Sequence, residues 1–375
     1  MNDLNYNNNI LLSDTIRFLR FPLIVGVVLI HSQIAGEWME RVTNTPTFDF
    51  PVYSSLTYFF SCIIARISVP LFFFFSGFLF FYKTSFNRSI YFQKLCKRGK
   101  TLLIPYLLWN LIAISLTVAL HFFLPGMVTE GPESYHTVGD YLQSFWDFKP
   151  FHHGTPMNDP LWFIRDLMVV MLASPLVFLL LKYCKLYGLG VLGILWFMGW
   201  WTTQPGFSIA ALFFFSVGAY FAIHKKNFVE IFKPHLSLAL VMYITTAVLQ
   251  MLLRRFGISS YISKINILFG IVMAISMTSW LIEKGIWKVN LFLTEASFFI
   301  YVYHGLIIYR LTSRAFMILP HTDWALSLIY LLCPVIIIGI GLPLFAILKK
   351  ALPKTTALLM GNRQINRTII RPKYE

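Results

Sequence analysis

The sequence predicts an all-α polytopic membrane protein with about ten transmembrane helices. Apolar residues make up 57% of the 375-residue chain and charged residues only 13%, about half the charged share of a soluble domain. The mean hydropathy is +0.67. A water-soluble protein of this length would need far more charge to cover its surface, and 37 Phe, 18 Tyr and 10 Trp residues exclude a disordered chain.

Apolar stretches recur along the chain at the length of a membrane span, for which roughly 20 residues are needed. Only helices and closed barrels cross lipid, and these runs are too continuous for the short alternating strands of a barrel. We expect residues 1–16 to be a disordered cytoplasmic lead, 17–348 a single membrane domain and 349–375 a basic cytoplasmic tail. The expected spans cover residues 17–36, 56–82, 101–123, 161–181, 186–201, 207–223, 236–253, 265–282, 297–319 and 324–348.

The net charge of +15 is distributed unevenly between alternate loops. If the N-terminus is cytoplasmic, the inside loops and the C-terminal tail hold 20 Lys and Arg residues, against two in the first two outside loops, 37–51 and 124–160. Because Lys and Arg are retained on the cytoplasmic side, both termini are predicted to be cytoplasmic. One outside loop disagrees with this assignment, since it carries Arg254, Arg255 and Lys264.

Span one carries a line of polar side chains on one helix face. His31 follows Arg20 by eleven residues, so the two lie about 20° apart around the helix axis and about 16 Å apart along it. Arg17 precedes Arg20 by about one turn on roughly the same face. A neutral imidazole can accept a proton from a hydroxyl as that hydroxyl attacks a carbonyl. The alternative is an interfacial histidine beside two anchoring arginines.

Further cations lie inside span two and just before span three. Arg66 precedes Pro70, which removes a backbone donor and kinks the helix. Inside a span Arg66 needs a partner, and an interior ion pair explains it as well as a role in a site. Lys97, Arg98 and Lys100 precede span three, where a cationic cluster suits the phosphates of lipid headgroups or of a nucleotide-bearing donor.

Spans four and nine contribute four more candidate residues. Trp162 fits an interfacial aromatic belt. Arg165 and Asp166 are adjacent, so their side chains point about 100° apart on a helix and need not pair with each other. His304 is a second histidine within a predicted span. It indicates either a polar cavity or a hydrogen bond between helices.

Six motifs occur in an order that resembles the acyltransferase-3 family of integral membrane acyltransferases. The resemblance covers nearly the whole chain, from about residue 13 to 348, and its strength comes from the order, since each motif alone is weak. The motifs are Arg20-x10-His31, the run VPLFFFFSGF at 69–78, Lys97-Arg98-x-Lys100 before Ile104-Pro105-Tyr106, LWFIRDL at 161–167, FSVGA at 215–219 and SFFIYVYH at 297–304.

The resemblance implies transfer of an acyl group, most often acetyl, from cytoplasmic acetyl-CoA or another acyl-CoA to a hydroxyl of an extracytoplasmic polysaccharide or glycolipid. It assigns catalysis to His31 and Arg20, with the histidine acting as a general base or as a transient acyl carrier. We expect acyl-CoA to be bound by Arg17, Lys97, Arg98 and Lys100. Candidates for acceptor binding or for oxyanion stabilisation are Arg66, Trp162, Arg165 and His304.

The expected partners are membrane lipids and a glycan or lipid-linked sugar, in the inner (plasma) membrane, without nucleic acid. The four cysteines suggest neither disulfides nor a zinc site, so we expect no metal. Family members often have arginine where this chain has Lys100, and lysine is a point charge rather than a bidentate fork. Some relatives carry an added extracytoplasmic hydrolase-like domain. Without one, the membrane domain is expected to act on its acceptor alone or with a separate partner.

Two other functional classes remain open from the residues. A transporter or flippase of glycolipids or acyl intermediates would also contain intramembrane arginine and histidine, but such proteins often show inverted repeats, and none is visible here. A lipid-linked glycosyltransferase would need paired acids in the first outside loop. Glu37, Glu40 and Asp49 lie there without forming a tight pair.

Overall fold

The computed structural model describes residues 2–34, 50–123, 137–148 and 154–362. These residues form helices and contain no β-strand, which confirms the all-α class for this part of the chain. The charge assignments for loops 37–51 and 124–160, and for the tail beyond residue 362, fall partly outside the described residues. Helix α1 begins at Asn2, within the lead that we expected to be disordered.

The first half of the chain contains several short helices and irregular turns. They are α1 (Asn2–His31), α3 (Pro51–Thr57), the π-helix η2 (Tyr58–Ile64), the 3-10 turn η3 (Ala65–Ile67), α4 (Ser68–Phe81), α5 (Arg88–Arg98), the π-helix η4 (Gly99–Leu103), α6 (Ile104–Phe123), α7 (Val138–Gln143), η7 (Asp159–Leu161), α8 (Trp162–Leu172) and α9 (Ser174–Tyr183).

The second half contains the longest helices of the chain after α1. It is made of α10 (Lys185–Met198), α11 (Ile209–Ile223), α12 (Phe228–Phe232), the 3-10 turn η8 (Lys233–His235), α13 (Leu236–Leu252), α14 (Ser259–Glu283), α15 (Leu291–Ile318), α16 (Asp323–Ala351) and α17 (Pro353–Leu359).

Six helices in the described residues are long and apolar enough to cross a membrane, and the α8–α9 pair, bent by 60°, makes a possible seventh. The chain is therefore a multi-pass membrane protein, but ten spans are not confirmed. Helices α10 and α11 have 14 and 15 residues, short of the roughly 20 that a bilayer core requires. Helix α1 is 30 residues long, yet Asp14, Arg17 and Arg20 interrupt its apolar run.

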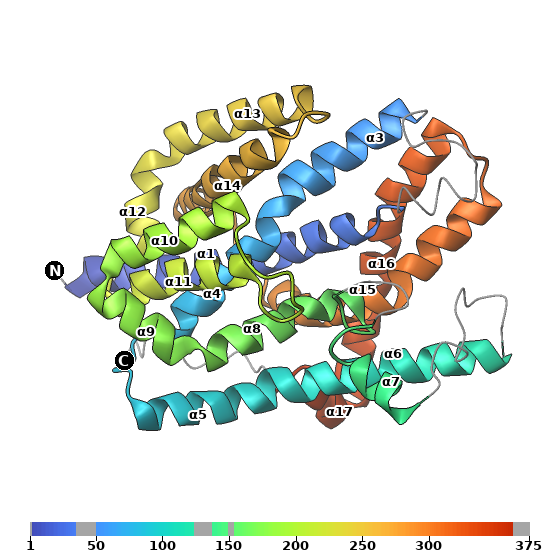
Figure 1. Cartoon of the computed structure of the whole chain (residues 1–375), viewed down its shortest axis with the longest axis horizontal. Helices are drawn as coiled ribbons and strands as arrows, with labels where there is room; N and C mark the ends of the chain where they lie inside the picture. Colours follow the sequence, from blue (N-terminus) through green and yellow to red (C-terminus); the bar gives the residue numbers. More distant parts are fainter. Residues whose placement is uncertain (1, 35–49, 124–136, 149–153, 363–375) are drawn as a thin grey trace.

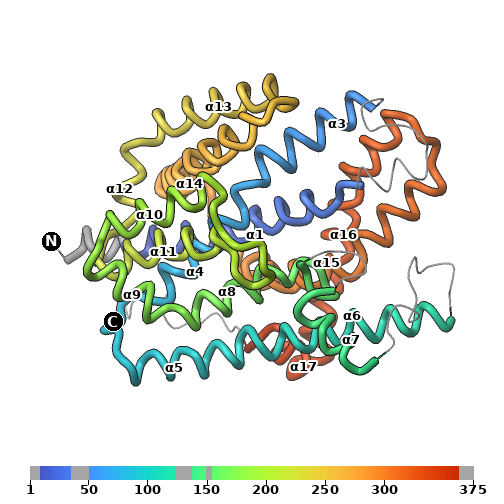
Figure 2. Tube along the Cα trace, in the orientation of Figure 1, coloured from blue at the N-terminus to red at the C-terminus, as the bar shows by residue number. Residues whose placement is uncertain are grey.

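Helix α1 runs through the middle of the molecule, where it contacts α4, α14, α15 and the irregular segments η2 and η3 (Figure 1). The tube view shows α5 and α6 along one side of the bundle, and α13 and α14 along the other (Figure 2). A residue on α1 can therefore face several elements that are distant in sequence.

The starts of α3 and α16 share one end of the bundle. Asp323 accepts hydrogen bonds from the backbone N–H groups of Val52 and Tyr53, at 2.9 and 2.7 Å. At the other end of α16, Lys349 pairs with Glu295 near the start of α15. Helices α15 and α16 are therefore antiparallel neighbours, as consecutive crossings of a membrane require.

The loop that disagreed with the charge rule also lies at the end where α3 begins. Arg254 donates a hydrogen bond to the Ser55 hydroxyl at 3.2 Å, and the Tyr58 and Ser259 hydroxyls are 2.7 Å apart. This placement agrees with a loop on the same side as the first outside loop. Which side of the membrane that end faces stays a prediction.

Helices α4 and α11 cross with their backbones in contact. A Cβ atom on Gly77 would lie 1.9 Å from the carbonyl oxygen of Phe215, and one on Gly218 would lie 1.9 Å from that of Phe74. Only glycine permits this approach, and small residues play this role widely between membrane helices. The crossing holds α4 in place, and α4 forms one wall of the cavity described next.

Candidate active site

A cavity of about 970 Å³ runs along one face of α1, and we call it the α1 cavity. The α1 residues that line it form one wall and recur every three or four positions, which is the spacing of one helix face. At 1.5 Å per residue this wall is roughly 30 Å long. It consists of Asn9, Leu12, Ser13, Ile16, Arg17, Arg20, Ile24, Val27, Ile30 and His31.

Helix α4 forms the facing wall and runs antiparallel to α1. Near its end, Tyr82 donates a hydrogen bond to the Asn9 side chain at 3.0 Å. Near its start, a Cβ on Gly26 would lie 2.5 Å from the Ser68 hydroxyl. Arg66 precedes Ser68 by two residues, so in this antiparallel arrangement it lies beyond the level of Gly26, on the His31 side of the α1 wall.

One end of the α1 cavity gathers positive charge, and we call it the basic end. The guanidinium of Arg20 is within electrostatic range of those of Arg17 and Arg98, although they come from α1 and α5. Because like charges repel, the close approach of these side chains favours an anion between them. The basic end is lined by Arg17, Arg20, Lys97 and Arg98.

Acidic groups neutralise only part of the basic end. Asp14 lies 3.2 Å from the Arg17 guanidinium. Glu295 also lines the cavity, but its carboxylate pairs with Lys349. Lys100, which we predicted with this group, does not line the α1 cavity. Within the described part of the chain, Arg20 has no carboxylate within ion-pair distance.

Arg66 is a further cation that lines the α1 cavity. It lies in the 3-10 turn η3, which follows the π-helix η2 and precedes α4, and such irregular turns often mark functional positions. Its side chain is exposed and lines the cavity, as expected of a cation within an apolar span. The interior ion pair that the sequence left open is not found among the described residues.

The other end of the α1 cavity is the histidine end, where three elements meet. The Nδ1 atom of His31 lies 2.9 Å from the hydroxyl of Tyr309 and 3.2 Å from Oδ2 of Asp159. The Tyr309 hydroxyl donates to the same Asp159 oxygen at 2.7 Å. The His31 and Asp159 side chains are 13% and 10% exposed, so this triangle is mostly buried but reaches the cavity through His31.

Turn η7, which carries Asp159, is fastened to α6 and α15. The Asn158 backbone N–H donates to the side-chain oxygen of Asn110 at 3.0 Å, and the Asn158 amide donates to the Val302 carbonyl at 3.1 Å. The Tyr301 hydroxyl donates to the carbonyl of Pro160. These bonds fix the carboxylate of Asp159 relative to α15, and so relative to His31.

Turn η7 and the residue before it also pack closely against Gly305 of α15. A Cβ on Gly305 would lie 2.1 Å from Oδ1 of Asn158 and 2.6 Å from a ring carbon of Pro160. We therefore expect Gly305→Ala to destabilise the detergent-solubilised protein by about 1–3 kcal/mol, the usual cost of overpacking. Gly339→Ala on α16 is the control, because nothing lies within 4 Å of its added Cβ. Equal unfolding midpoints for the two variants would contradict this close fit.

Trp162 and His304 are two further predicted site residues near this end. Trp162 lines the α1 cavity. His304 is fully buried, with its ring centre 5.4 Å from that of His31. Its Nδ1 atom is 3.1 Å from the Ile300 carbonyl, and its Nε2 atom has no partner among the described residues. His304 therefore packs behind His31 and does not line the cavity wall.

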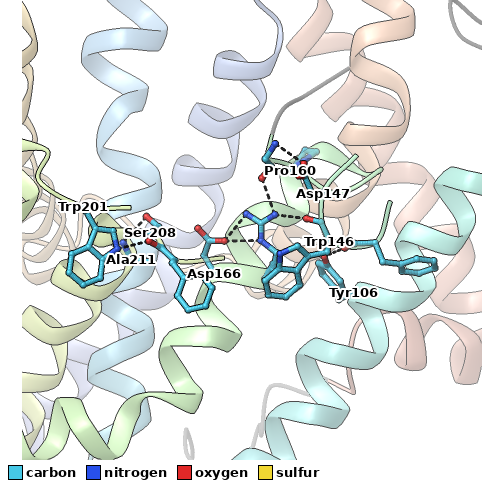
Figure 3. A network of polar contacts seen from close by, with 12 residues as sticks. Tyr106, Trp146, Asp147, Pro160, Asp166, Trp201, Ser208 and Ala211 are labelled. Carbon is cyan, nitrogen blue, oxygen red and sulfur yellow. Dashed lines mark hydrogen bonds and ion pairs between the residues drawn. The ribbon is translucent and has the colours of Figure 1, made fainter. Parts of the chain in front are cut away.

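Arg165 belongs to a different network, which corrects our expectation that it need not pair with Asp166. Its Nε and Nη2 atoms donate to Oδ1 of Asp166 at 3.0 and 2.9 Å. Its Nη1 atom donates to the carbonyls of Trp146 and Gly154 at 2.6 and 2.9 Å. Figure 3 shows this network around Asp166 and Trp146. Arg165 is buried and does not line the α1 cavity, so it holds the segment that precedes η7.

Two residues of the histidine end were not singled out from the sequence. Asp159 stands directly before a proline at the start of span four, and Tyr309 lies in span nine, five residues after His304. The position of Asp159 at the end of an apolar span could have identified it as a candidate, since charged groups there are costly and often functional. Tyr309 gave no such signal, because tyrosine is common in membrane helices.

Comparisons with known proteins identify the family of this chain. The family model described as the acyltransferase domain Acyl_transf_3 matches residues 14–347. The succinoglycan biosynthesis protein ExoH of Rhizobium meliloti (strain 1021) is 27% identical over 227 residues, which cover 57% of this chain and 55% of that protein. This chain thus aligns with about half the length of that relative, and no solved structure matches. Because the family model covers nearly the whole chain, the chain belongs to the acyltransferase-3 family.

Proposed function

We propose that the protein is a membrane O-acyltransferase that moves an acyl group, in the first instance acetyl, from cytoplasmic acyl-CoA to a hydroxyl of an extracytoplasmic polysaccharide or glycolipid. One observation carries the proposal. A single cavity joins four cations at its basic end to a histidine, held by a carboxylate, at the other. The relative named for succinoglycan biosynthesis supports a glycan acceptor.

The basic end suits the phosphates of the donor. Charge-assisted hydrogen bonds can come from its four cations, Arg17, Arg20, Lys97 and Arg98. An arginine can bind a phosphate through two parallel N–H donors. Beyond these cations the α1 wall is apolar from Ile24 to Ile30, which suits an extended arm without charge. In this arrangement the thioester lies near Arg66, close to His31.

His31 acts as the general base. Its imidazole accepts the proton of the acceptor hydroxyl as the oxygen attacks the thioester carbonyl. The new C–O bond gives a tetrahedral intermediate, whose collapse breaks the C–S bond, and the thiolate of CoA leaves and takes up a proton. Arg66 faces the cavity and stabilises the negative charge that develops on the carbonyl oxygen. Trp162 offers an aromatic face to the sugar ring.

The charge distribution supports an orientation in which the basic end faces the cytoplasm. Residues 83–100, which follow α4, and the tail after α16 are rich in Lys and Arg, and such segments are retained inside. Acyl-CoA is cytoplasmic, so the donor enters at the basic end and the histidine end meets the acceptor from the opposite side. The protein then works as a multi-pass protein of the inner (plasma) membrane.

The direct test incubates membranes that contain the overexpressed chain with acetyl-CoA labelled in its acetyl group. We expect label to appear, bound as an alkali-labile ester, in polymeric or lipid-linked sugar. Membranes without the chain give the background. Unlabelled acetyl-CoA should compete for the reaction, whereas free acetate should not.

The same experiment separates the enzyme from a transporter or flippase. A transporter would move label or glycolipid across the membrane without forming an ester. Label that stays in acetyl-CoA, in preparations where the chain is folded and an acceptor glycolipid is present, would overturn the proposed acetyl transfer. A panel of longer acyl-CoA donors then shows whether another acyl group is used.

A further inference from the structure

The Tyr309 hydroxyl has one proton, and the atoms around it determine where that proton is directed. Tyr309 lies 2.7 Å from Oδ2 of Asp159, and an ionised carboxylate can only accept hydrogen bonds. The proton of Tyr309 is therefore directed at Asp159. The Tyr309 oxygen is also 2.9 Å from Nδ1 of His31, and it has no second proton to donate there.

The proton between His31 and Tyr309 must then belong to the histidine. Both neighbours of Nδ1, the Tyr309 oxygen at 2.9 Å and the Asp159 oxygen at 3.2 Å, can only accept from it. A neutral histidine carries one ring proton, and the hydrogen bond made by one nitrogen determines which atom holds it. With the proton on Nδ1, the lone pair is on Nε2.

We infer that Asp159 and Tyr309 act as a pair that fixes His31 in the Nδ1–H tautomer, so that its Nε2 lone pair is available to the acceptor hydroxyl. This inference rests on the proposed acyl transfer and assigns two positioning residues to it. It also explains why three separate elements, α1, η7 and α15, converge at this end of the cavity.

His304 does not disturb this assignment. Its Nδ1 atom faces the Ile300 carbonyl at 3.1 Å, and a carbonyl only accepts, so Nδ1 of His304 carries the proton and its Nε2 holds a lone pair. His304 therefore has no ring proton left to block Nε2 of His31. The two rings are 5.4 Å apart between centres and tilted by 53°.

The proton balance of the step follows from this arrangement. As the acceptor oxygen attacks, its proton moves to Nε2 of His31, which becomes an imidazolium with protons on both nitrogens. The Nδ1–H bond to Asp159 then becomes an ion pair in a largely buried site, where it is stronger than in water. Collapse of the intermediate breaks the C–S bond, and the imidazolium gives its proton to the departing thiolate.

The test compares Tyr309→Phe and Asp159→Asn with wild type in the labelled acetyl-transfer assay. Asparagine would donate its amide N–H to Nδ1 and so force the proton onto Nε2. We expect Asp159→Asn to lower kcat about 10³- to 10⁴-fold, as tautomer inversion does in serine proteases. Tyr309→Phe should lower kcat about tenfold, since one hydrogen bond is lost. The KM for acetyl-CoA should stay unchanged in both variants.

Matched controls separate positioning from folding. Tyr330→Phe removes another buried tyrosine hydroxyl, which is bonded to Ser61 at 2.7 Å and not to His31. It should leave kcat near wild type. Asp159→Ala should regain part of its activity with added formate, which can accept from Nδ1 in place of the carboxylate. A purely structural role for Asp159 would give no such rescue.

The outcomes distinguish this inference from the proposed function. If wild type transfers no acyl group from any acyl-CoA, the proposed function fails. If wild type is active and Tyr309→Phe matches Tyr330→Phe, or formate leaves Asp159→Ala unchanged, the tautomer assignment fails while the transferase activity stands. A proportional loss of kcat and of folded protein, measured by size-exclusion chromatography in detergent, would likewise overturn the positioning role.

Discussion

Replacement of His31 by alanine is expected to abolish acyl transfer while the protein remains folded in the membrane. His31 is the one histidine that lines the described α1 cavity, and general-base catalysis by a positioned side chain contributes about 10²- to 10⁴-fold. We therefore expect at least a 100-fold loss of kcat in His31→Ala, about the lower limit of that range. Labelled ester formed per folded protein is the measurement.

The binding of the donor should survive this substitution. The two α1 cations of the basic end, Arg17 and Arg20, lie about three helix turns or more from His31, since His31 is eleven positions after Arg20. We expect His31→Ala to bind labelled acetyl-CoA as wild type does in a filter-binding assay. His235→Ala, which changes an exposed histidine of η8 outside the cavity, is the control. Normal acylation by His31→Ala would disprove the mechanism.

Composition predicted the class of this fold because it reports burial in lipid. The apolar runs at 56–82, 265–282, 297–319 and 324–348 lie within long helices of the structure, to within one residue at their ends. Hydropathy cannot detect how a helix bends or how far it reaches. The α8–α9 stretch bends by 60°, and α10 ends at Gly199 in a left-handed conformation after only 14 residues. For these reasons the described residues support six or seven spans, and the expected count of ten is not confirmed.

Helix periodicity predicted which residues of one helix share a face, and the structure places Arg17, Arg20 and His31 together on the α1 cavity. Periodicity gives no information about partners on other helices. Asp159 and Tyr309 are 128 and 278 positions from His31 in sequence, so only the packing of η7 and α15 against α1 brings them to it. The pairing of Arg165 with Asp166 has a different cause: it depends on side-chain rotamers, which helix periodicity does not specify.

The second large effect is expected at Arg20. This arginine has no carboxylate partner among the described residues and faces the cavity beside Arg17 and Arg98, so its guanidinium is available to a phosphate. Loss of a charge-assisted hydrogen bond costs about 1.5–3 kcal/mol. Arg20→Ala should therefore lower kcat/KM for acetyl-CoA about 10- to 100-fold, mainly through KM. The kcat/KM of Arg20→Lys should lie between those of wild type and Arg20→Ala, because lysine keeps the charge without the bidentate geometry.

Two comparisons show whether this loss concerns the donor phosphates. Arg88→Ala removes an exposed arginine of α5 that does not line the cavity and should leave KM unchanged. S-acetyl-pantetheine carries the thioester without any phosphate, so wild type and Arg20→Ala should use it equally poorly. That equality is the signature of a contact that exists only with the nucleotide part of the donor. If Arg20→Ala loses the same factor with both donors, Arg20 acts near the thioester or on the fold, and the basic end does not bind the phosphates of acyl-CoA through it.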